Sequence, residues 1–368
     1  MNMKRYKEFD WGLLLVVFLL FAAGLLLISS AARVNETGNY RKLMVQSAAF
    51  GLGILVIVFS MFFDYNDFRK YRLHFYIGSI FLLLLVYVPK LGKVQFGARS
   101  WISLGPIDFQ PLELVKILFI LSFAEYLDKK KGRINTPKEV FKALCYPLPI
   151  ILLLMAQPDL GGAIVFLCIT FGMIFIAGVN MKIVGYFCVS AALTLPILYS
   201  YVLKPHQKGR IDAFLHPGDP SYEANFHAIQ SMVAIGSGRL LGKGFFNGTQ
   251  NRYGFLPVNE SDFIFAVLGE EFGFVGMMIL LVFYFIFFLR ILNTAMTAKD
   301  NYGTLICTGV ISMFLYQFIQ NIGMTIGIMP VTGLTLPFVS YGGSSILTSM
   351  MALAMIFNVS VNKRRINF

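Results

Sequence analysis

Charged residues are scarce in this chain. Asp, Glu, Lys and Arg make up 14% of its 368 residues, hydrophobic residues make up 57%, and the mean hydropathy is +0.69. A soluble domain carries about 25% charged residues. The composition therefore excludes an ordinary water-soluble protein and favours one whose main solvent is lipid.

Cysteine is also infrequent. The four cysteines lie inside apolar runs and show neither CxxC nor metal-ligand spacing, which excludes a disulfide framework and a zinc centre. We expect them to be small core residues. They are Cys145, Cys168, Cys188 and Cys307.

The sequence also lacks a soluble domain boundary, a low-complexity tract and an internal repeat, so we expect a single polytopic membrane domain over residues 1–368. The net charge is +12, which in a soluble protein would suggest a nucleic acid partner. Here Lys and Arg fall mostly in short loops between apolar runs, which is typical of membrane topology. No nucleic acid partner is therefore expected.

Ten apolar runs approach the length of a membrane span, since a bilayer core about 30 Å thick needs about 20 residues of helix. With the N-terminus inside, most Lys and Arg of the short loops lie on the cytoplasmic side, as the positive-inside rule requires. The prediction is an all-α integral membrane protein with about ten transmembrane helices and both termini cytoplasmic. The runs lie near 11–32, 43–63, 73–92, 111–128, 143–157, 161–179, 183–203, 263–290, 303–327 and 333–360.

The longest polar segment, residues 204–262, is predicted to be a large extracytoplasmic loop between helices 7 and 8. Within it, Tyr222, Phe226 and Val233 recur at helical spacing, which predicts a helix lying on the membrane surface. A glycine-rich stretch follows, with Arg239 and Lys243 embedded in it. Two interpretations are open: a flexible loop, or a backbone and cationic cradle for a phosphate.

Four segments break the hydrophobic pattern, and on this topology all four lie at or near the outer face. Irregular backbone at membrane depth needs protein or a watery cavity around it, so their shared side predicts one outward-opening cavity. The segments are residues 96–116, residues 157–161, the long loop ending at Asp262, and residues 329–343.

The last of these segments contains several prolines and glycines, which predict a bent or partly unwound stretch lining the cavity. Its hydroxyl groups are candidates for binding polar parts of a ligand, and a purely structural kink is the alternative. These hydroxyls belong to Ser340, Tyr341 and Ser344.

Ionisable residues within or beside the apolar runs are functional candidates because burying them unpaired is costly. Glu113 and Lys116 are three residues apart on one helix face and can pair. They either organise a site or form a structural ion pair. Asp159 follows Pro158 at an outer helix turn, where a helix N-cap is an alternative to a chemical role.

Asp262 is the sharpest catalytic candidate, because it lies where the polar loop meets the eighth expected span. Its alternative role is again that of an N-cap. A helix N-terminus would make the carboxylate a weaker base, so a base role requires burial or the nearby Glu260 to oppose that effect. Glu270 and Glu271 lie two turns further on and are expected to pair with neighbouring helices.

The chain resembles the shape, elongation, division and sporulation (SEDS) family over essentially its whole length. The resemblance rests on GARSWI, FQPLELVK, QPDLG, SDFIFAVLGEEFG and VTGLTLPFVSYGGSS, and the QPDLG and GMTIGIMPVTG segments are nearer to the elongation members. Leu112 replaces the family's usual serine, and Glu260-Ser261 replaces its usual His-Thr. The Asp, Glu and Lys of these motifs remain.

The resemblance implies a peptidoglycan glycosyltransferase of the bacterial cell membrane that polymerises lipid II during cell elongation, with Asp262 as the catalytic aspartate. It also implies partners: a class B penicillin-binding protein, other elongation-complex proteins, undecaprenyl-pyrophosphate-linked glycan and membrane lipid. The alternatives are a flippase for lipid-linked precursors and a non-catalytic scaffold for a transpeptidase.

In this interpretation Asp262 is the general base for attack with inversion at the donor anomeric carbon, and cations stabilise the departing pyrophosphate. A divalent cation, Mg²⁺ or Mn²⁺, is a further candidate for that role, and no other cofactor is expected. The candidate substrate-binding residues are Glu113, Lys116, Arg99, Arg210, Arg239, Lys243, Asp159, Gln110 and Ser344.

Overall fold

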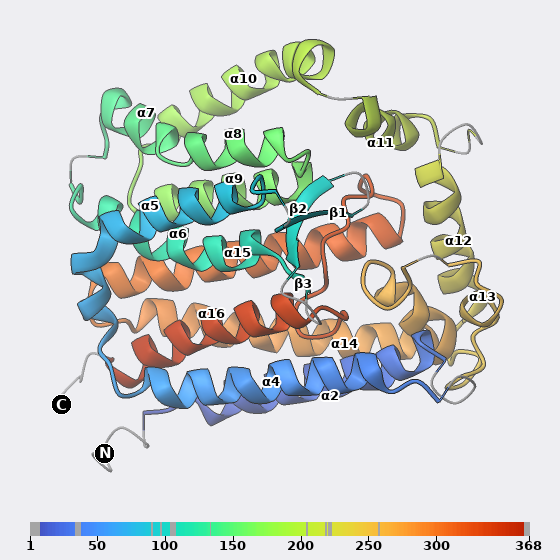
Figure 1. Ribbon diagram of the computed structural model, residues 1–368. Helices are drawn as coiled ribbons and strands as arrows, with labels where there is room; N and C mark the ends of the chain where they lie inside the picture. The colour runs from blue at the N-terminus through green and yellow to red at the C-terminus, as the bar shows by residue number, and fades with distance from the viewer. Residues whose placement is uncertain are drawn as a thin grey trace.

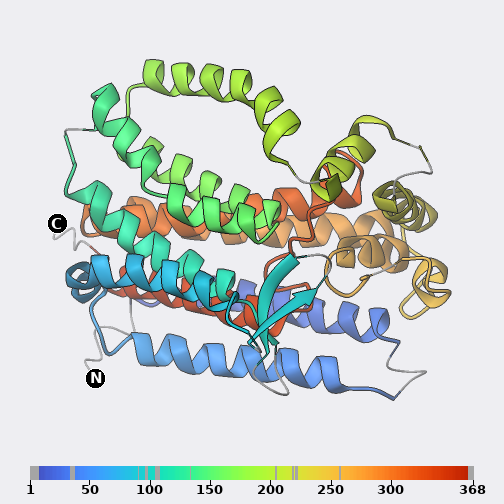
Figure 2. The same ribbon diagram turned by 45° about the horizontal axis from the view of Figure 1, so that its top comes forward.

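Long helices run side by side along most of the protein in a computed structural model, and shorter helices gather at one end (Figure 1, Figure 2). The structure describes residues 8–33, 38–89, 91–95, 98–103, 108–132, 134–203, 205–217, 219, 223–256 and 258–363. The predicted helix start at 220–222 lies outside these residues.

The helices and strands have the following bounds: α2 Trp11–Ala31, α4 Arg41–Ser60, the 3₁₀ helix η1 Tyr65–Tyr71, α5 Arg72–Leu85, β1 Gly92–Gln95, β2 Ala98–Ser103, β3 Asp108–Phe109, α6 Pro111–Asp128, α7 Pro137–Cys145, α8 Leu148–Ala156, α9 Leu160–Ile176, α10 Met181–Ile197, the π-helix η2 Leu198–Val202, α11 Pro205–Leu215, α12 Glu223–Ser237, α13 Thr249–Arg252, α14 Ile264–Met296, α15 Asn301–Thr325 and α16 Gly343–Val361.

Six helices in the described part of the chain are long and apolar enough to cross a membrane: α2, α4, α7 with α8, α14, α15 and α16. The protein is therefore a multi-pass, mostly helical membrane protein. Each of the ten predicted apolar runs contains helix. The last run was predicted to begin near residue 333, but its helix begins at Gly343, because residues 330–336 and the turn after them are irregular.

Both ends of the chain meet at one end of the bundle, which we call the termini end (Figure 1). The Ser360 hydroxyl donates a hydrogen bond to the carbonyl of Glu8 at 3.2 Å, and the rings of Phe9 and Phe357 stack with centroids 4.5 Å apart. The opposite end carries α11, α12 and α13, and we call it the loop end (Figure 2).

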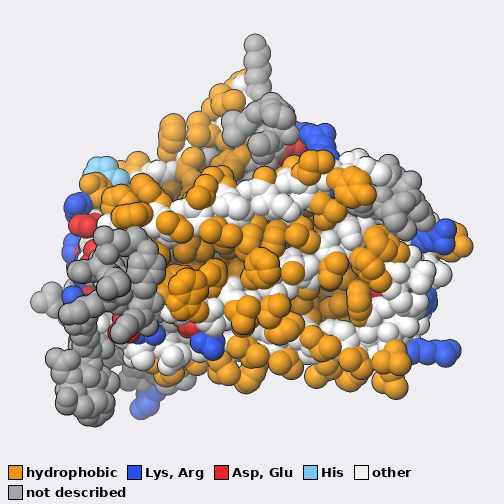
Figure 3. Space-filling view, turned by 90° about the horizontal axis from the view of Figure 1, so that it is seen from below, with side chains coloured by type: hydrophobic (Ala, Val, Ile, Leu, Met, Phe, Trp, Pro, Cys, Tyr) orange, Lys and Arg blue, Asp and Glu red, His pale blue; other side chains and the backbone are white. Residues whose placement is uncertain are grey.

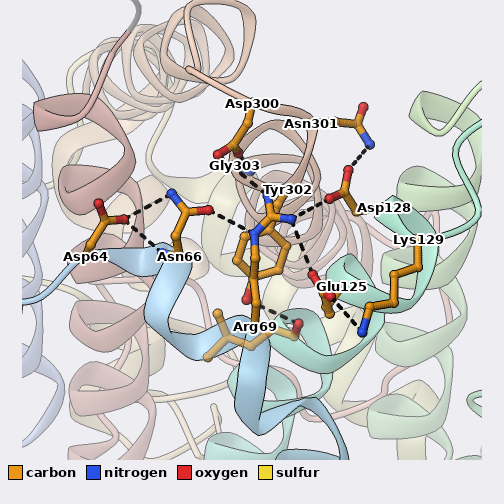
Figure 4. A network of polar contacts seen from close by, with 11 residues as sticks. Asp64, Asn66, Arg69, Glu125, Asp128, Lys129, Asp300, Asn301, Tyr302 and Gly303 are labelled. Atoms are coloured by element: carbon orange, nitrogen blue, oxygen red, sulfur yellow. Dashed lines mark hydrogen bonds and ion pairs between the residues drawn. The ribbon is translucent and has the colours of Figure 1, made fainter.

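At the termini end, Arg69 of η1 lies at the centre of a polar network that joins η1, α6 and α15 (Figure 4). Its guanidinium is 2.7 Å from the Asp128 carboxylate and 3.5 Å from that of Asp300. It also lies 4.5 Å from the centre of the Tyr302 ring. Because the carboxylate of Glu125, 3.6 Å from Arg69, is buried, the network neutralises charge that membrane burial would otherwise make costly.

A small antiparallel sheet, in the order β1, β2, β3, follows α5 near the middle of the bundle (Figure 1). Gly92 pairs with Ile102, and Ile102 pairs with Phe109. The sequence prediction contained helices alone, so these strands are an addition to it. They lead the GARSWI segment back to the start of α6.

One side of the bundle exposes a broad apolar band, with most charged side chains gathered toward its ends (Figure 3). Exposed residues include Phe18 and Leu15 of α2 and Leu55 and Phe59 of α4. Lipid chains can solvate such a surface, so its exposure agrees with a membrane-embedded bundle.

Candidate functional site

Asp262 lies in the turn that leads into α14. The helix N-cap is Phe263, which makes no side-chain capping bond, so the N-cap alternative for Asp262 is wrong. Its backbone N–H instead donates to the Val258 carbonyl at 3.1 Å. One carboxylate oxygen accepts a hydrogen bond from the Ser261 hydroxyl at 2.8 Å, while the carboxylate as a whole is only half-buried.

The surroundings of Asp262 favour a stronger base than an aspartate in water. Desolvation by the surrounding protein raises its pKa, and the nearby Glu260 carboxylate raises it further. The Ser261 hydrogen bond and the positive charge of Arg210 act in the opposite direction. Burial has the largest effect on this pKa. The carboxylate is therefore a stronger base than a helix N-terminus alone would make it.

The irregular segment before α16 lies directly against this carboxylate. A Cβ added to Gly333 would lie 3.2 Å from the second carboxylate oxygen of Asp262, and Gly333 has a positive φ of 71°. Asn321 of α15 joins the two segments, because its amide donates to the carbonyls of Asp262 at 3.0 Å and Leu334 at 2.8 Å. The close approach therefore depends on a glycine and on a buried amide.

The QPDLG turn approaches the same segment from α9. Asp159 is the N-cap of α9, accepting a hydrogen bond from the Gly162 N–H at 2.8 Å. A Cβ on Gly161 would lie 3.2 Å from the Thr332 carbonyl oxygen. The capping alternative for Asp159 is thus confirmed, and Gly161 in the first turn of the same helix lies against the segment that contacts Asp262.

Glu113 and Lys116 form the predicted pair on α6. The Lys116 ammonium lies 2.8 Å from the Glu113 carboxylate, and both side chains are buried. Both interact electrostatically with Asp159. Lys116 is the cation of this cluster, beside the two carboxylates of Glu113 and Asp159.

Arg210 of α11 links the two aspartates, because its charge acts on both Asp159 and Asp262. The structure therefore brings together candidate residues from α6, the start of α9, α11 and the turn before α14. Two buried polar atoms in this region have no hydrogen-bond partner among the described residues: Asn321 Oδ1 and Thr332 Oγ1. They leave hydrogen-bonding capacity for a polar ligand.

Part of the backbone of the glycine-rich stretch is bonded to α14. Helix α14 is broken at Gly273, which has φ 64° and ψ −162°. The N–H groups of Lys243 and Gly244 donate at 3.0 Å to the carbonyls of Glu270 and Glu271. Because the break and this loop satisfy each other's backbone groups, those N–H groups are not available to cradle a phosphate.

Lys243 and Arg239 lie in that loop and serve it structurally. The Lys243 ammonium is 2.7 Å from the buried Glu270 carboxylate. The Arg239 carbonyl accepts a bond from the Phe274 N–H at 2.8 Å, and its side chain is exposed. Glu271 accepts a hydrogen bond from Ser30 of α2, so the predicted helix pairing holds for Glu271.

The remaining candidates cluster at the sheet and the adjoining helix starts. The Ser344 hydroxyl donates to the Asp108 carbonyl at 3.4 Å, and the Gln110 carbonyl accepts from the Glu113 N–H at 3.1 Å. Arg99 of β2 is half-buried, and its Nε has no hydrogen-bond partner among the described residues. None of these contacts joins them directly to Asp262.

Comparison with known proteins decides the family. The family model described as "Cell cycle protein" (FtsW, RodA, SpoVE) matches residues 10–365. The chain is 33% identical to the peptidoglycan glycosyltransferase RodA of Treponema pallidum, covering all of both chains. It belongs to the FtsW/RodA/SpoVE family.

Solved structures agree with this family's fold. A chain from a peptidoglycan synthase complex, in a structure concerning coordination of polymerization and crosslinking, is 32% identical, with a TM-score of 0.80 over 96% of this chain and 97% of that one. Thermus thermophilus RodA is 29% identical, with a TM-score of 0.71 over 97% and 98%. The family resemblance predicted from the motifs is confirmed, including its closeness to RodA.

Two buried polar residues beside the candidate site were missed by sequence reasoning. Asn321 and Gln46 are buried amides in apolar helices, and both bond the irregular backbone around Asp262. A polar residue within an apolar run was the available signal.

Proposed function

We propose that this protein polymerises lipid II into glycan strands at the outer face of the bacterial cell membrane during cell elongation, with Asp262 as general base. It is a peptidoglycan glycosyltransferase. The observation that carries the base assignment is the half-buried Asp262 carboxylate, whose pKa is raised mainly by desolvation. Catalytic bases work best when their pKa approaches the working pH.

The proposed step needs only one carboxylate. Asp262 accepts the proton of the acceptor GlcNAc 4-hydroxyl as that oxygen bonds to the anomeric carbon of the donor. The bond from this carbon to the undecaprenyl pyrophosphate oxygen breaks with inversion, and the electron pair leaves on the pyrophosphate. Because pyrophosphate is already a good leaving group, it needs charge stabilisation more than protonation.

Arg210 and Lys116 are the proposed cations for that stabilisation. Arg210 acts electrostatically on Asp262 and on Asp159, and Lys116 belongs to the cluster around Asp159. Lys243 is already neutralised by Glu270, so it is a weaker candidate. Arg99 remains a candidate because no described residue forms a hydrogen bond with its Nε.

A divalent cation is proposed to enter with the pyrophosphate. Among the described residues there is no group of three or more His, Cys, Asp or Glu side chains that could hold a metal ion. Mg²⁺ is often bound through one or two carboxylates together with substrate phosphates. A preassembled protein metal centre therefore does not fit the described side chains, whereas a cation brought by the substrate does.

The proposed topology has ten spans, cytoplasmic termini and the segment 204–262 outside. Four further helices, α5, α6, α9 and α10, would join the six that satisfy length and composition alone. The loop end would then face outward with Asp262. A class B penicillin-binding protein is the proposed partner that crosslinks the product.

The test is glycan synthesis by purified protein with its partner, comparing wild type and Asp262→Asn with and without magnesium. Loss of polymer with normal folding and partner binding is expected for Asp262→Asn. Asp67→Asn, which changes an exposed carboxylate at the termini end, should retain full activity. Wild-type polymerisation by Asp262→Asn would overturn the base assignment.

The same variants separate the alternatives. A flippase would move lipid II across vesicles in both wild type and Asp262→Asn, and neither would make polymer. A scaffold would leave glycan synthesis unchanged by Asp262→Asn, while removal of the whole protein would abolish complex assembly.

A further inference from the structure

Gln46 is a buried amide near the start of α4, between Val45 and Ser47. Its side chain is 0% exposed. Burying an amide in an apolar environment is costly unless its polar atoms are bonded. Both polar atoms of this amide form hydrogen bonds with residues outside α4. Nε2 donates to the Ser340 carbonyl at 2.9 Å, and Oε1 accepts from the Gly342 N–H at 3.0 Å.

These two bonds hold the backbone on either side of Tyr341. The segment has no regular helix or strand to fix it, because α16 begins only at Gly343. The Ser340 hydroxyl also accepts a bond from the Leu336 N–H at 2.9 Å, which closes the turn internally. Gln46 is therefore an anchor that fixes this turn from another helix.

The same turn holds the backbone that carries Asp262. The Tyr341 N–H donates to the Glu260 carbonyl at 2.8 Å, and the Ser340 hydroxyl donates to the Ser261 carbonyl. Asn321 then holds the Asp262 carbonyl. Three successive carbonyls are thus fixed by donors from other segments, two of them from the turn that Gln46 anchors.

We propose that Gln46 is a positioning residue for Asp262 and acts through Ser340 and the turn 340–342. This inference rests on the proposed role of Asp262 as base. A catalytic group must be held within about 0.5 Å of its productive position. A displacement of about 1 Å can cost about 100-fold in rate. Gln46 reaches the site from a helix that supplies none of the proposed catalytic groups.

Gln46→Leu tests the proposal, because leucine fills similar space but makes neither hydrogen bond. We expect kcat for lipid II polymerisation to fall about 10- to 100-fold while KM changes less than about twofold. Ser340→Ala should act in the same direction, and Ser340→Thr should recover most of the activity because it keeps the hydroxyl. The double variant Gln46→Leu/Ser340→Ala should be little worse than the poorer single variant.

Ser79→Ala is the matched control. Ser79 is a buried hydroxyl whose bond goes to the Phe75 carbonyl of its own helix, so its loss should leave kcat within about twofold. Wild-type kcat in folded Gln46→Leu protein would overturn the proposal. A rise in KM with unchanged kcat would also overturn it, since that pattern indicates lost substrate binding.

Two further measurements keep the outcomes distinct. If Gln46→Leu does not fold, the comparison of Ser340→Ala with Ser340→Thr decides. Equal activity of these two variants overturns the proposal, and activity in Ser340→Thr alone supports it. Asp262→Asn tests the base separately. An inactive Asp262→Asn protein beside a fully active Gln46→Leu protein would overturn only the positioning role.

Discussion

The Lys243 ammonium lies 2.7 Å from the Glu270 carboxylate, which is 1% exposed. Glu270 also accepts the backbone N–H of Gln250 at 3.0 Å, so one carboxylate fastens two parts of the loop to α14. Lys243 is therefore committed to the loop that repairs the break at Gly273. A residue expected to bind pyrophosphate therefore helps to fix the loop that packs against the break in α14.

Replacing Lys243 by Met should loosen this loop. Removing one partner of a buried ion pair costs about 3–5 kcal/mol, because the remaining charge is left uncompensated. We expect faster hydrogen exchange at the Lys243 and Gly244 amides and a lower thermal unfolding temperature in detergent. Arg239→Met, which changes an exposed side chain of the same loop, should change neither. Unchanged exchange with a higher KM for lipid II would instead support the pyrophosphate role.

The break in α14 should be intolerant of any side chain at Gly273. Its φ is +64°, and an added Cβ would lie 2.3 Å from the Gly242 nitrogen and 2.6 Å from the Leu240 carbonyl oxygen. Gly273→Ala should lower the free energy of unfolding by about 2 kcal/mol or more. Gly51→Ala is the control, because no atom lies within 4 Å of its added Cβ. Thermal unfolding of both variants measures the difference, and equal stability would contradict it.

These two cases show what the sequence could predict. The helices were predictable, because apolar length is a local signal, whereas the catalytic role of Asp262 stays a prediction. The role of Lys243 was not, since the same glycine-rich pattern serves a phosphate or a broken helix, and the choice depends on carbonyls about 27 residues away. The start of α16 and the anchoring by Gln46 likewise depend on segments that meet only in the folded chain.

Glu260 should raise the pH at which activity is lost in acid. Asp262 must be ionised to accept a proton, so kcat/KM falls as the pH falls through its pKa. Desolvation and the Glu260 charge raise this pKa, whereas Ser261 and Arg210 lower it. The acid limb of wild type should therefore lie above the ordinary aspartate value of about 3.9.

Glu260→Gln removes a negative charge, so it should lower the pKa of Asp262 and move the acid limb to lower pH. Lys42 pairs with Glu260, so Lys42→Met leaves the Glu260 charge uncompensated. This variant should therefore move the acid limb to higher pH. The measurement is the pH profile of kcat/KM. Glu139→Gln, at a carboxylate paired with Lys130 and Lys142 on α7, should leave the limb in place. A shift to higher pH in Glu260→Gln would contradict the assignment.

Arg69 should stabilise the termini end without taking part in catalysis. Arg69→Met would leave the carboxylates of Asp128 and the buried Glu125 without their shared cation (Figure 4). The guanidinium is partly exposed, so the expected loss is about 1–3 kcal/mol rather than the larger cost of a fully buried pair.

The neighbouring Lys70 provides the matched control for Arg69. Its pair with Asp67 spans 3.6 Å, and both side chains are about 60% exposed, so Lys70→Met should cost less than about 1 kcal/mol. Thermal unfolding in detergent compares the two variants, and polymer synthesis per folded molecule should stay at the wild-type level in both. Equal unfolding temperatures of Arg69→Met and Lys70→Met would mean that solvent screens the Arg69 ion pairs as strongly as the exposed Lys70–Asp67 pair. Lost activity in folded Arg69→Met protein would instead indicate that the termini end is coupled to Asp262 at the loop end.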